Sequence, residues 1–229
     1  MDNYEAYLVN RPLFSKFDRE NGIPVIRKNN PKLINIEQGK FLNFSNLKKV
    51  NENSIVLTFI DDKKLNRLWN NPLNYVSKFR KCMAVISPDF TIQKKMDPPL
   101  VTANIYKNRW LGCTYQQYGV NVIPSISWAD KETYDICFSG FESNSIVAVS
   151  TIGCRGESER KVFLDGYNEL LKRKSPSLVI CYGGVISGMT GKILPVEYKE
   201  GFDNKKYEYI PLFEISKVLD LKGDEHYGR

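Results

Sequence analysis

Histidine is almost absent from this sequence, and its scarcity disfavours several classes of site. The single histidine is His226, which lies in a polar C-terminal tail. Catalytic triads that use histidine, Cys-His dyads and zinc sites with histidine ligands are therefore disfavoured. Any acid–base chemistry must come from aspartate, glutamate, tyrosine, cysteine or lysine side chains.

Paired cysteines and long apolar runs are also missing. The five cysteines lie far apart with no CxxC pair, which is typical of reduced thiols in a cytosol. The N-terminus has no charged start followed by an apolar stretch, and no apolar run approaches the roughly 18 residues that a membrane helix needs. We therefore expect a cytoplasmic protein without a membrane partner. The cysteines are Cys82, Cys113, Cys137, Cys154 and Cys181.

Blocks of like charge are absent, although the chain is basic overall. The formal net charge is +7, from 33 lysines and arginines against 26 aspartates and glutamates. The basic residues are interleaved with acidic ones along the whole chain. This balance permits contact with nucleic acid, but a solvated surface on a lysine-rich protein explains it equally well.

Residues 1–50 differ in composition from the rest of the 229-residue chain. Asparagine, lysine and proline dominate there, and apolar residues occur singly or in pairs without a sustained period. We predict an irregular basic N-terminal arm, with one short strand at residues 23–26, packed on an α/β domain of residues 51–229. If the protein binds nucleic acid, this arm, which includes Lys48 and Lys49, is a candidate for one edge of the binding groove.

Residues 120–154 hold two apolar runs rich in β-branched residues, with a short helix-like segment between them. Runs that are apolar on both faces suit parallel strands covered by helices on each side. We predict an α/β fold with a mainly parallel sheet of about six strands and crossover helices, either open and doubly wound or incomplete and TIM-barrel-like. The expected strands are residues 54–60, 82–86, 120–126, 146–151, 177–182 and 193–198, with a further short strand at 207–212. The longer expected helices are residues 98–118 and 157–174, with a terminal helix at 215–221.

Four aspartates follow the expected strands: Asp61, Asp62, Asp89 and Asp130. Because the C-terminal ends of parallel strands share one edge, where such folds bind ligands, these carboxylates are candidates for one site. Their oxygens would suit Mg²⁺ or Mn²⁺ and phosphoryl chemistry, with Asp89 and Asp130 as metal ligands and Asp62 as a third catalytic group. The alternative is that each carboxylate caps a helix, which needs no shared site.

Other residues near strand ends are candidate substrate-binding groups. Trp128 would stack on a base, or simply pack in the core. Ser127 belongs to this group, although Ser127 and Asp130 also fit a capping box. Arg155 would help a glycine-bearing turn to bind a phosphate, but acidic residues already complement the dipole of the following helix. The remaining candidates are Ser150, Thr151 and Tyr182.

Several motifs in a fixed order carry a resemblance to one family. They are Asp61-Asp62, Leu68-Trp69-Asn70-Asn71-Pro72, Ser87-Pro88-Asp89-Phe90, Ile126-Ser127-Trp128, Val147-Ala148-Val149-Ser150-Thr151-Ile152-Gly153-Cys154 and Tyr182-Gly183. Together they span residues 54–183 and resemble domain of unknown function 4417. The resemblance implies a protein of bacteria, phages, plasmids or integrated elements, and it implies no particular activity.

Two functions from different classes fit these residues. The first is a metal-dependent enzyme of a phage or mobile element that acts on a phosphodiester or a nucleotide. The alternative is a non-catalytic binding protein that contacts nucleic acid or a host protein through the basic arm and the face formed by Lys107 and Arg109. Both functions stay open on the sequence alone.

Overall fold

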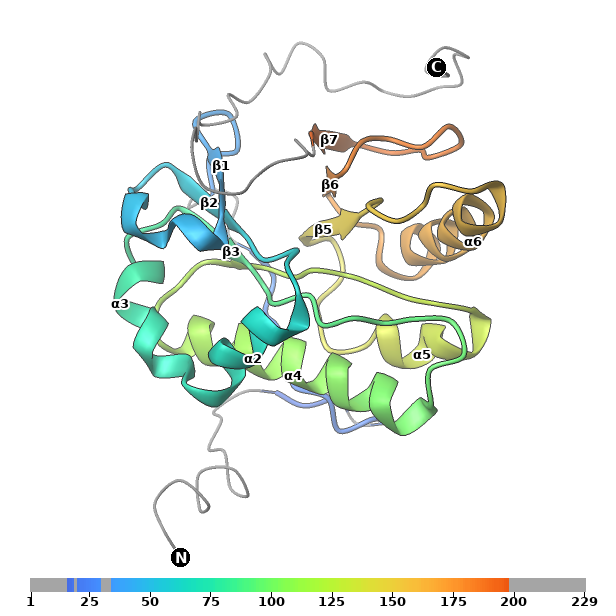
Figure 1. Cartoon of the computed structure of the whole chain (residues 1–229), viewed down its shortest axis with the longest axis horizontal. Coiled ribbons are helices and arrows are strands. Elements are labelled where there is room, and N and C mark those ends of the chain that lie inside the picture. The colour runs from blue at the N-terminus through green and yellow to red at the C-terminus, as the bar shows by residue number, and fades with distance from the viewer. Residues whose placement is uncertain (1–15, 19, 30–33, 198–229) are drawn as a thin grey trace, which may run out of the picture.

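Two parallel sheets form the fold of residues 16–18, 20–29 and 34–197, the part of the chain that the computed structural model describes (Figure 1). The first sheet has the order β1-β2-β3-β4 and the second has the order β5-β6-β7. Every neighbouring pair of strands is parallel, which confirms the predicted strand direction. The strands are β1 (Lys40–Asn43), β2 (Ser54–Leu57), β3 (Ala84–Ile86), β4 (Val122–Ile123), β5 (Ile146–Ser150), β6 (Leu178–Tyr182) and β7 (Ile193–Val196).

The two sheets meet just after β4, at a single bridge between Ser125 and Ala148. Two backbone hydrogen bonds hold this bridge, from the Ile126 N–H to the Ala148 carbonyl (2.8 Å) and from the Ala148 N–H to the Pro124 carbonyl (2.9 Å). Proline has no N–H to donate to a ladder, and β4 accordingly ends at Ile123. The single sheet of about six strands that the sequence predicts is therefore not found, and the described residues form no closed barrel.

Helices or 3₁₀ turns lie between successive strands, as crossovers between parallel strands require, except between β6 and β7, which residues 183–192 join without a helix. The helix α6 spans the predicted residues, and α4 ends one residue before the predicted boundary, next to Gly119 with its φ of +79°. Within the described ranges, no helix is both long and apolar enough to cross a membrane. The helices are α2 (Asp62–Asn70), α3 (Val76–Phe79), α4 (Pro98–Gln117), α5 (Tyr134–Cys137) and α6 (Glu157–Lys174), with 3₁₀ turns η1 (Phe44–Lys49), η2 (Pro72–Tyr75) and η3 (Lys131–Thr133).

Strand residues are buried on both faces of the sheets, as expected for parallel strands covered by helices. Ile55 and Leu57 of β2 belong to one core cluster, which also contains Tyr182 of β6. Val56 belongs to the other cluster, which contains the buried residues of the helices. The rings of Phe59 and Tyr182 stack with centroids 5.3 Å apart, so the ends of β2 and β6 lie close together.

The N-terminal segment is more regular than the irregular arm predicted for residues 1–50. Residues 40–49 are not irregular, because β1 pairs with β2 in parallel register and η1 follows it directly. Phe41 and Leu42 are buried, so they belong to the core of the sheet. The strand predicted at residues 23–26 is only a pair of isolated bridges, formed by Pro24 and Ile26. The elements predicted at residues 207–212 and 215–221 lie outside the described residues.

Candidate functional site

Polar residues after β2, β3 and β4 meet at one edge of the first sheet, as the parallel topology predicts. The Thr58 hydroxyl lies 3.0 Å from the Ile86 carbonyl and 2.9 Å from the Ser87 carbonyl. The Ser87 hydroxyl donates to the Asn108 Oδ1 atom (2.9 Å), and the Asn108 Nδ2 atom donates to the Ser125 hydroxyl (2.7 Å). All four side chains are buried, and together they form a polar network that fixes the strand ends.

Arg109 of α4 is the charged centre of this network and is fully buried. Its guanidinium donates to the Asn108 Oδ1 atom (2.7 Å) and to the Ser125 carbonyl (2.9 Å). Its other nitrogens donate to the carbonyls of Cys137 (2.9 Å) and Ser139 (3.1 Å). Arg109 therefore ties α4 to the end of β4 and to the segment that follows α5.

Burial also removes Arg109 from any surface that could contact nucleic acid. Desolvation lowers the pKa of Arg109 to about 10, so the guanidinium stays charged at neutral pH. The neighbouring Lys107 is half-buried, with its Nζ atom 5.2 Å from the centre of the Phe90 ring and 3.3 Å from the Asn104 Oδ1 atom. The predicted binding face of Lys107 and Arg109 is therefore wrong.

Asp89 follows β3 and lies beside this network. Its Oδ1 atom is buried and has no hydrogen-bond partner among the described residues. Burial raises the pKa of Asp89 to about 6, and the charge of Asp62 adds to the rise. The hydroxyls of Ser127 and Ser125 and the charge of Arg109 lower the pKa, although neither hydroxyl forms a hydrogen bond to Oδ1. Asp89 is half-buried as a whole, but a carboxyl with one buried, unpartnered oxygen and a perturbed pKa at a strand edge is a candidate functional group.

The other predicted carboxylates have different surroundings. Asp61 caps α2, because its Oδ1 atom accepts a hydrogen bond from the Lys63 N–H (2.7 Å), as the capping alternative predicts. Asp62 accepts hydrogen bonds from the Thr91 N–H (3.1 Å) and hydroxyl (3.0 Å), which places it in the same loop region as Asp89. Asp130 precedes η3 without a side-chain cap, so the predicted capping box with Ser127 is wrong.

The described carboxylates do not form a cluster of metal ligands. Residues 16–18, 20–29 and 34–197 contain no group of three or more His, Cys, Asp and Glu side chains that could hold one. The carboxylate that acts on the pKa of Asp89 is Asp62, and Asp130 is not among its causes. The assignment of Mg²⁺ or Mn²⁺ to Asp89 and Asp130 therefore stays a prediction.

Trp128 packs against the helix layer. Its ring centre lies 5.1 Å from that of Phe163 on α6 and 5.7 Å from that of Phe138. A Cβ atom at Gly166 would collide with the indole, so glycine at this position lets the ring approach α6 closely. These contacts favour the packing alternative over a base-stacking role.

The remaining predicted binding residues make local contacts. The Thr151 hydroxyl donates to the Gly184 carbonyl (2.7 Å), and the Ser150 hydroxyl accepts from the Ile152 N–H (3.2 Å). Tyr182 is buried in the stack described above. Arg155 is exposed, and the Glu159 carboxylate fills the space beside Gly156 at the start of α6. An added anion would meet that carboxylate, so the turn is a poor phosphate site.

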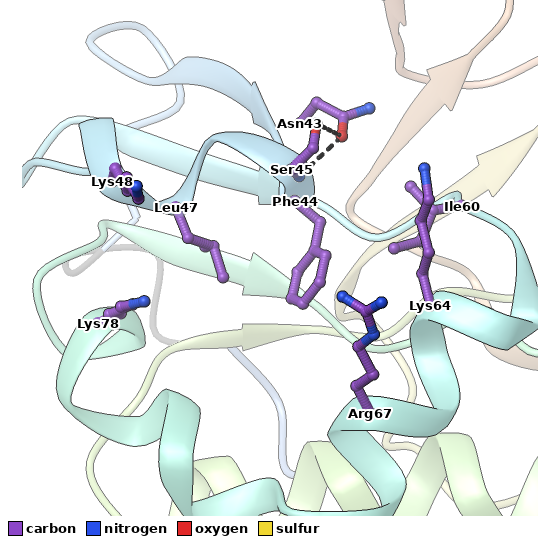
Figure 2. A pocket seen from close by; sticks show the side chains of 9 residues that line it. All are labelled: Asn43, Phe44, Ser45, Leu47, Lys48, Ile60, Lys64, Arg67 and Lys78. Atoms are coloured by element: carbon purple, nitrogen blue, oxygen red, sulfur yellow. Dashed lines mark hydrogen bonds between the residues drawn. The ribbon is translucent and has the colours of Figure 1, made fainter. Parts of the chain in front are cut away.

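The structure also contains a pocket that the sequence did not predict (Figure 2). It has a volume of about 320 Å³ and lies beyond the C-terminal ends of β1 and β2, next to α2 and α3. We call it the basic pocket, because its lining contains four cations and no carboxylate. The lining residues are Asn43, Phe44, Ser45, Leu47, Lys48, Ile60, Lys64, Arg67 and Lys78.

The cations of the basic pocket are available to a ligand. The side chains of Lys48, Lys64, Arg67 and Lys78 are exposed. None of them forms an ion pair or a side-chain hydrogen bond with any described residue. Four unpaired positive charges around one cavity create a positive potential, which attracts anions.

One wall of the basic pocket is an aromatic ring on a rigid support. Phe44 begins η1 directly after β1, and its ring lies 5.6 Å from that of Tyr75 and 6.5 Å from that of Phe79. The Asn43 Oδ1 atom caps η1 by accepting hydrogen bonds from the Ser45 N–H (3.0 Å) and hydroxyl (2.8 Å). The cap and the ring contacts therefore fix the position of Phe44.

Comparisons with known proteins identify the relatives of this chain. A family described as Domain of unknown function (DUF4417) matches residues 16–199. The chain is similar to the Gene 1 protein of Mycobacterium phage D29, with 33% identity over 126 residues, which are 55% of this chain and 47% of that protein. The Gene 1 protein of Mycobacterium phage L5 is 33% identical over 126 residues, which are 55% of each protein. The match therefore spans about half the length of these curated relatives. No solved structure matches the chain.

Proposed function

This chain belongs to the family described as Domain of unknown function (DUF4417) and is a phage-type protein, and on that premise we propose that it binds nucleic acid through the basic pocket. The observation that carries the proposal is a cavity with four cations and no carboxylate in its lining, where no cation forms an ion pair with a described residue. Phosphates of a nucleic-acid backbone are the anions that such a set of lysines and arginine attracts. The net charge of +7 adds a favourable long-range field.

The location of the basic pocket supports the same proposal. It lies beyond the C-terminal ends of β1 and β2, and the edge with Asp89 lies beyond the end of β3. As part of the proposal, the seven described strands form an incomplete barrel, which would place both features on its functional face. The bridge between Ser125 and Ala148 and the stacking of Phe59 on Tyr182 support this arrangement.

Salt-dependent binding to a labelled oligonucleotide tests the proposal. Four phosphate contacts to a single strand correspond to a slope of log K against log salt of about −3, or a loss of about 50-fold between about 50 and about 200 mM salt. Replacing Lys64 and Arg67 by glutamine should weaken binding and reduce the magnitude of the slope by about 1.4.

The matched control is Lys63→Gln. Lys63 is exposed and lies on α2 beside Lys64, but it does not line the basic pocket. This variant should bind almost as tightly as the unmodified chain, while Lys64→Gln should bind more weakly. Binding that does not respond to salt, or equal losses in both variants, would contradict the proposal.

A host protein is the alternative partner, since an acidic protein surface would also meet the four cations. Nucleic acid is favoured because Phe44 adds an aromatic wall on which a base can stack.

The proposal includes a cytoplasmic location, supported by the five cysteines, all of which are free thiols.

An enzyme acting on a phosphodiester or a nucleotide is a second candidate, and Asp89 is the observation that favours it. Its buried, unpartnered Oδ1 atom and its pKa of about 6 suit a group that exchanges a proton near neutral pH. Asp62 would assist by raising that pKa. Asp130 as a ligand of Mg²⁺ or Mn²⁺ stays a prediction from the sequence.

Cleavage assays on oligonucleotides, with and without added Mg²⁺ or Mn²⁺, test the second candidate. Asp89→Asn should abolish turnover and leave oligonucleotide binding unchanged, because Asp89 is not part of the basic pocket. Asp61→Asn is the control, because Asp61 caps α2 and asparagine caps equally well. Full turnover by Asp89→Asn would refute the role of Asp89.

A further inference from the structure

We infer that the basic pocket holds one unpaired nucleotide of a single strand, with its base against Phe44 and its two flanking phosphates on opposite pairs of cations. This inference rests on the proposed function and adds the class of nucleic acid. Three features of the basic pocket support it: its size, its aromatic wall and the placement of its charges.

The size of the basic pocket suits a nucleotide. Its volume of about 320 Å³ lies at the lower end of the range for small-ligand sites, about 300 to 1,000 Å³. A base and its sugar fill a cavity of this size. A duplex is far wider, because its bases are paired and stacked inside it, so its backbone could touch only the rim.

The wall around Phe44 suits an unstacked base. Phe44 is half-buried, and its contacts with Tyr75 and Phe79 hold the ring in place before a ligand arrives. Leu47 and Ile60 extend this apolar wall. Bases of single strands stack on such aromatic rings with little preference for sequence. The bases of a duplex are already stacked on one another and gain nothing from this wall.

The charges are divided between two sides of the apolar wall. In Figure 2, Lys64 and Arg67 lie on one side of Phe44, and Lys48 and Lys78 lie on the other. A nucleotide within a strand has a phosphate on each side of its sugar and base, so the two pairs of cations match the two phosphates. The phosphates of a free nucleoside triphosphate are all on one side and would leave one pair unused.

Affinity measurements with the full chain test the inference. Single-stranded and duplex oligonucleotides of the same length and sequence are compared by fluorescence anisotropy. We expect the single strand to bind at least tenfold more tightly. A 2-aminopurine base in the single strand should lose fluorescence on binding, because stacking on an aromatic ring quenches it.

Variants of Phe44 separate stacking from charge. Phe44→Leu should weaken binding of the single strand about tenfold without changing the salt slope, whereas Arg67→Gln should reduce the magnitude of the slope by about 0.7. Phe44→Tyr keeps an aromatic ring and should retain the affinity of the unmodified chain. Circular dichroism melting curves show whether each variant is folded. If Phe44→Leu unfolds, the affinities of the unmodified chain for single-stranded and duplex oligonucleotides test the inference without it.

The possible failures are distinguishable. Equal affinity for single strand and duplex, with a loss in Arg67→Gln for both, would overturn the inference and leave the proposed function intact. Tight binding of a nucleoside triphosphate that displaces the single strand at equal concentration would also overturn it. Salt-independent binding of every oligonucleotide would overturn both.

Discussion

Asp89→Asn should stabilise the folded protein at neutral pH. Burial raises the pKa of Asp89 from an ordinary value of 3.8 to about 6, so the folded state binds the proton more tightly than the unfolded chain. At about 1.36 kcal/mol per pKa unit, binding of this proton contributes about 3 kcal/mol to the free energy of unfolding. Below the ordinary pKa this contribution is fully present, and it is lost as the pH rises through the folded-state pKa of about 6.

Urea unfolding at a series of pH values measures this effect. Asparagine has nearly the shape of aspartate and cannot ionise, so Asp89→Asn should unfold at a higher urea concentration than the unmodified chain at about pH 7.5. The gain should be up to about 3 kcal/mol there and should shrink as the pH falls below about 6. Such a gain is expected where a functional group is held in a destabilising environment.

The control for this prediction is Asp61→Asn. Asp61 caps α2, and asparagine caps a helix about as well as aspartate, so the free energy of unfolding should barely change. Equal stability of Asp89→Asn and the unmodified chain at about pH 7.5 would refute the reasoning about desolvation. A stability difference that persists unchanged at about pH 4 would refute it as well.

Two further predictions concern packing and buried hydrogen bonds. Arg109→Met should lower the free energy of unfolding by about 3–5 kcal/mol, because it removes the hydrogen bonds that Arg109 donates to the carbonyls of Ser125, Cys137 and Ser139; no loss in a urea titration would contradict this. Gly166→Ala should cost about 1–3 kcal/mol, because the new methyl group meets the Trp128 indole. Combining Gly166→Ala with a smaller ring at Trp128 should recover part of that loss in thermal unfolding, and strictly additive losses would show that the two residues do not interact.

Much of the fold could be predicted because its longer elements carry clear signals. The helix α6 has inward apolar residues at helical spacing and basic residues in its last turn, and its observed bounds match the prediction. The strand β1 was missed because its four residues contain only one apolar pair, Phe41 and Leu42. It becomes a strand through its pairing with β2, which a local pattern cannot show.

The candidate site could be predicted only in part. Asp89 follows a strand of a parallel sheet, and the rule that strand ends share one edge identified it in advance. The roles of the neighbouring aspartates could not be separated by that rule, because Asp61 and Asp62 are adjacent in the sequence and differ in the donors that each carboxylate meets in the fold. The basic pocket was missed because its cations are spread from Lys48 to Lys78, and each one alone is an ordinary surface charge.

The joint between the two sheets has a mechanical consequence. Ser125 pairs with Ala148 across the joint, and its own carbonyl and hydroxyl accept hydrogen bonds from Arg109 and Asn108. The same residue therefore fastens one half of the molecule to the other and anchors the buried cation. Sliding of one half past the other would break the two backbone hydrogen bonds to Ala148 and pull on the residue that binds Arg109, so the two halves should resist sliding at this joint.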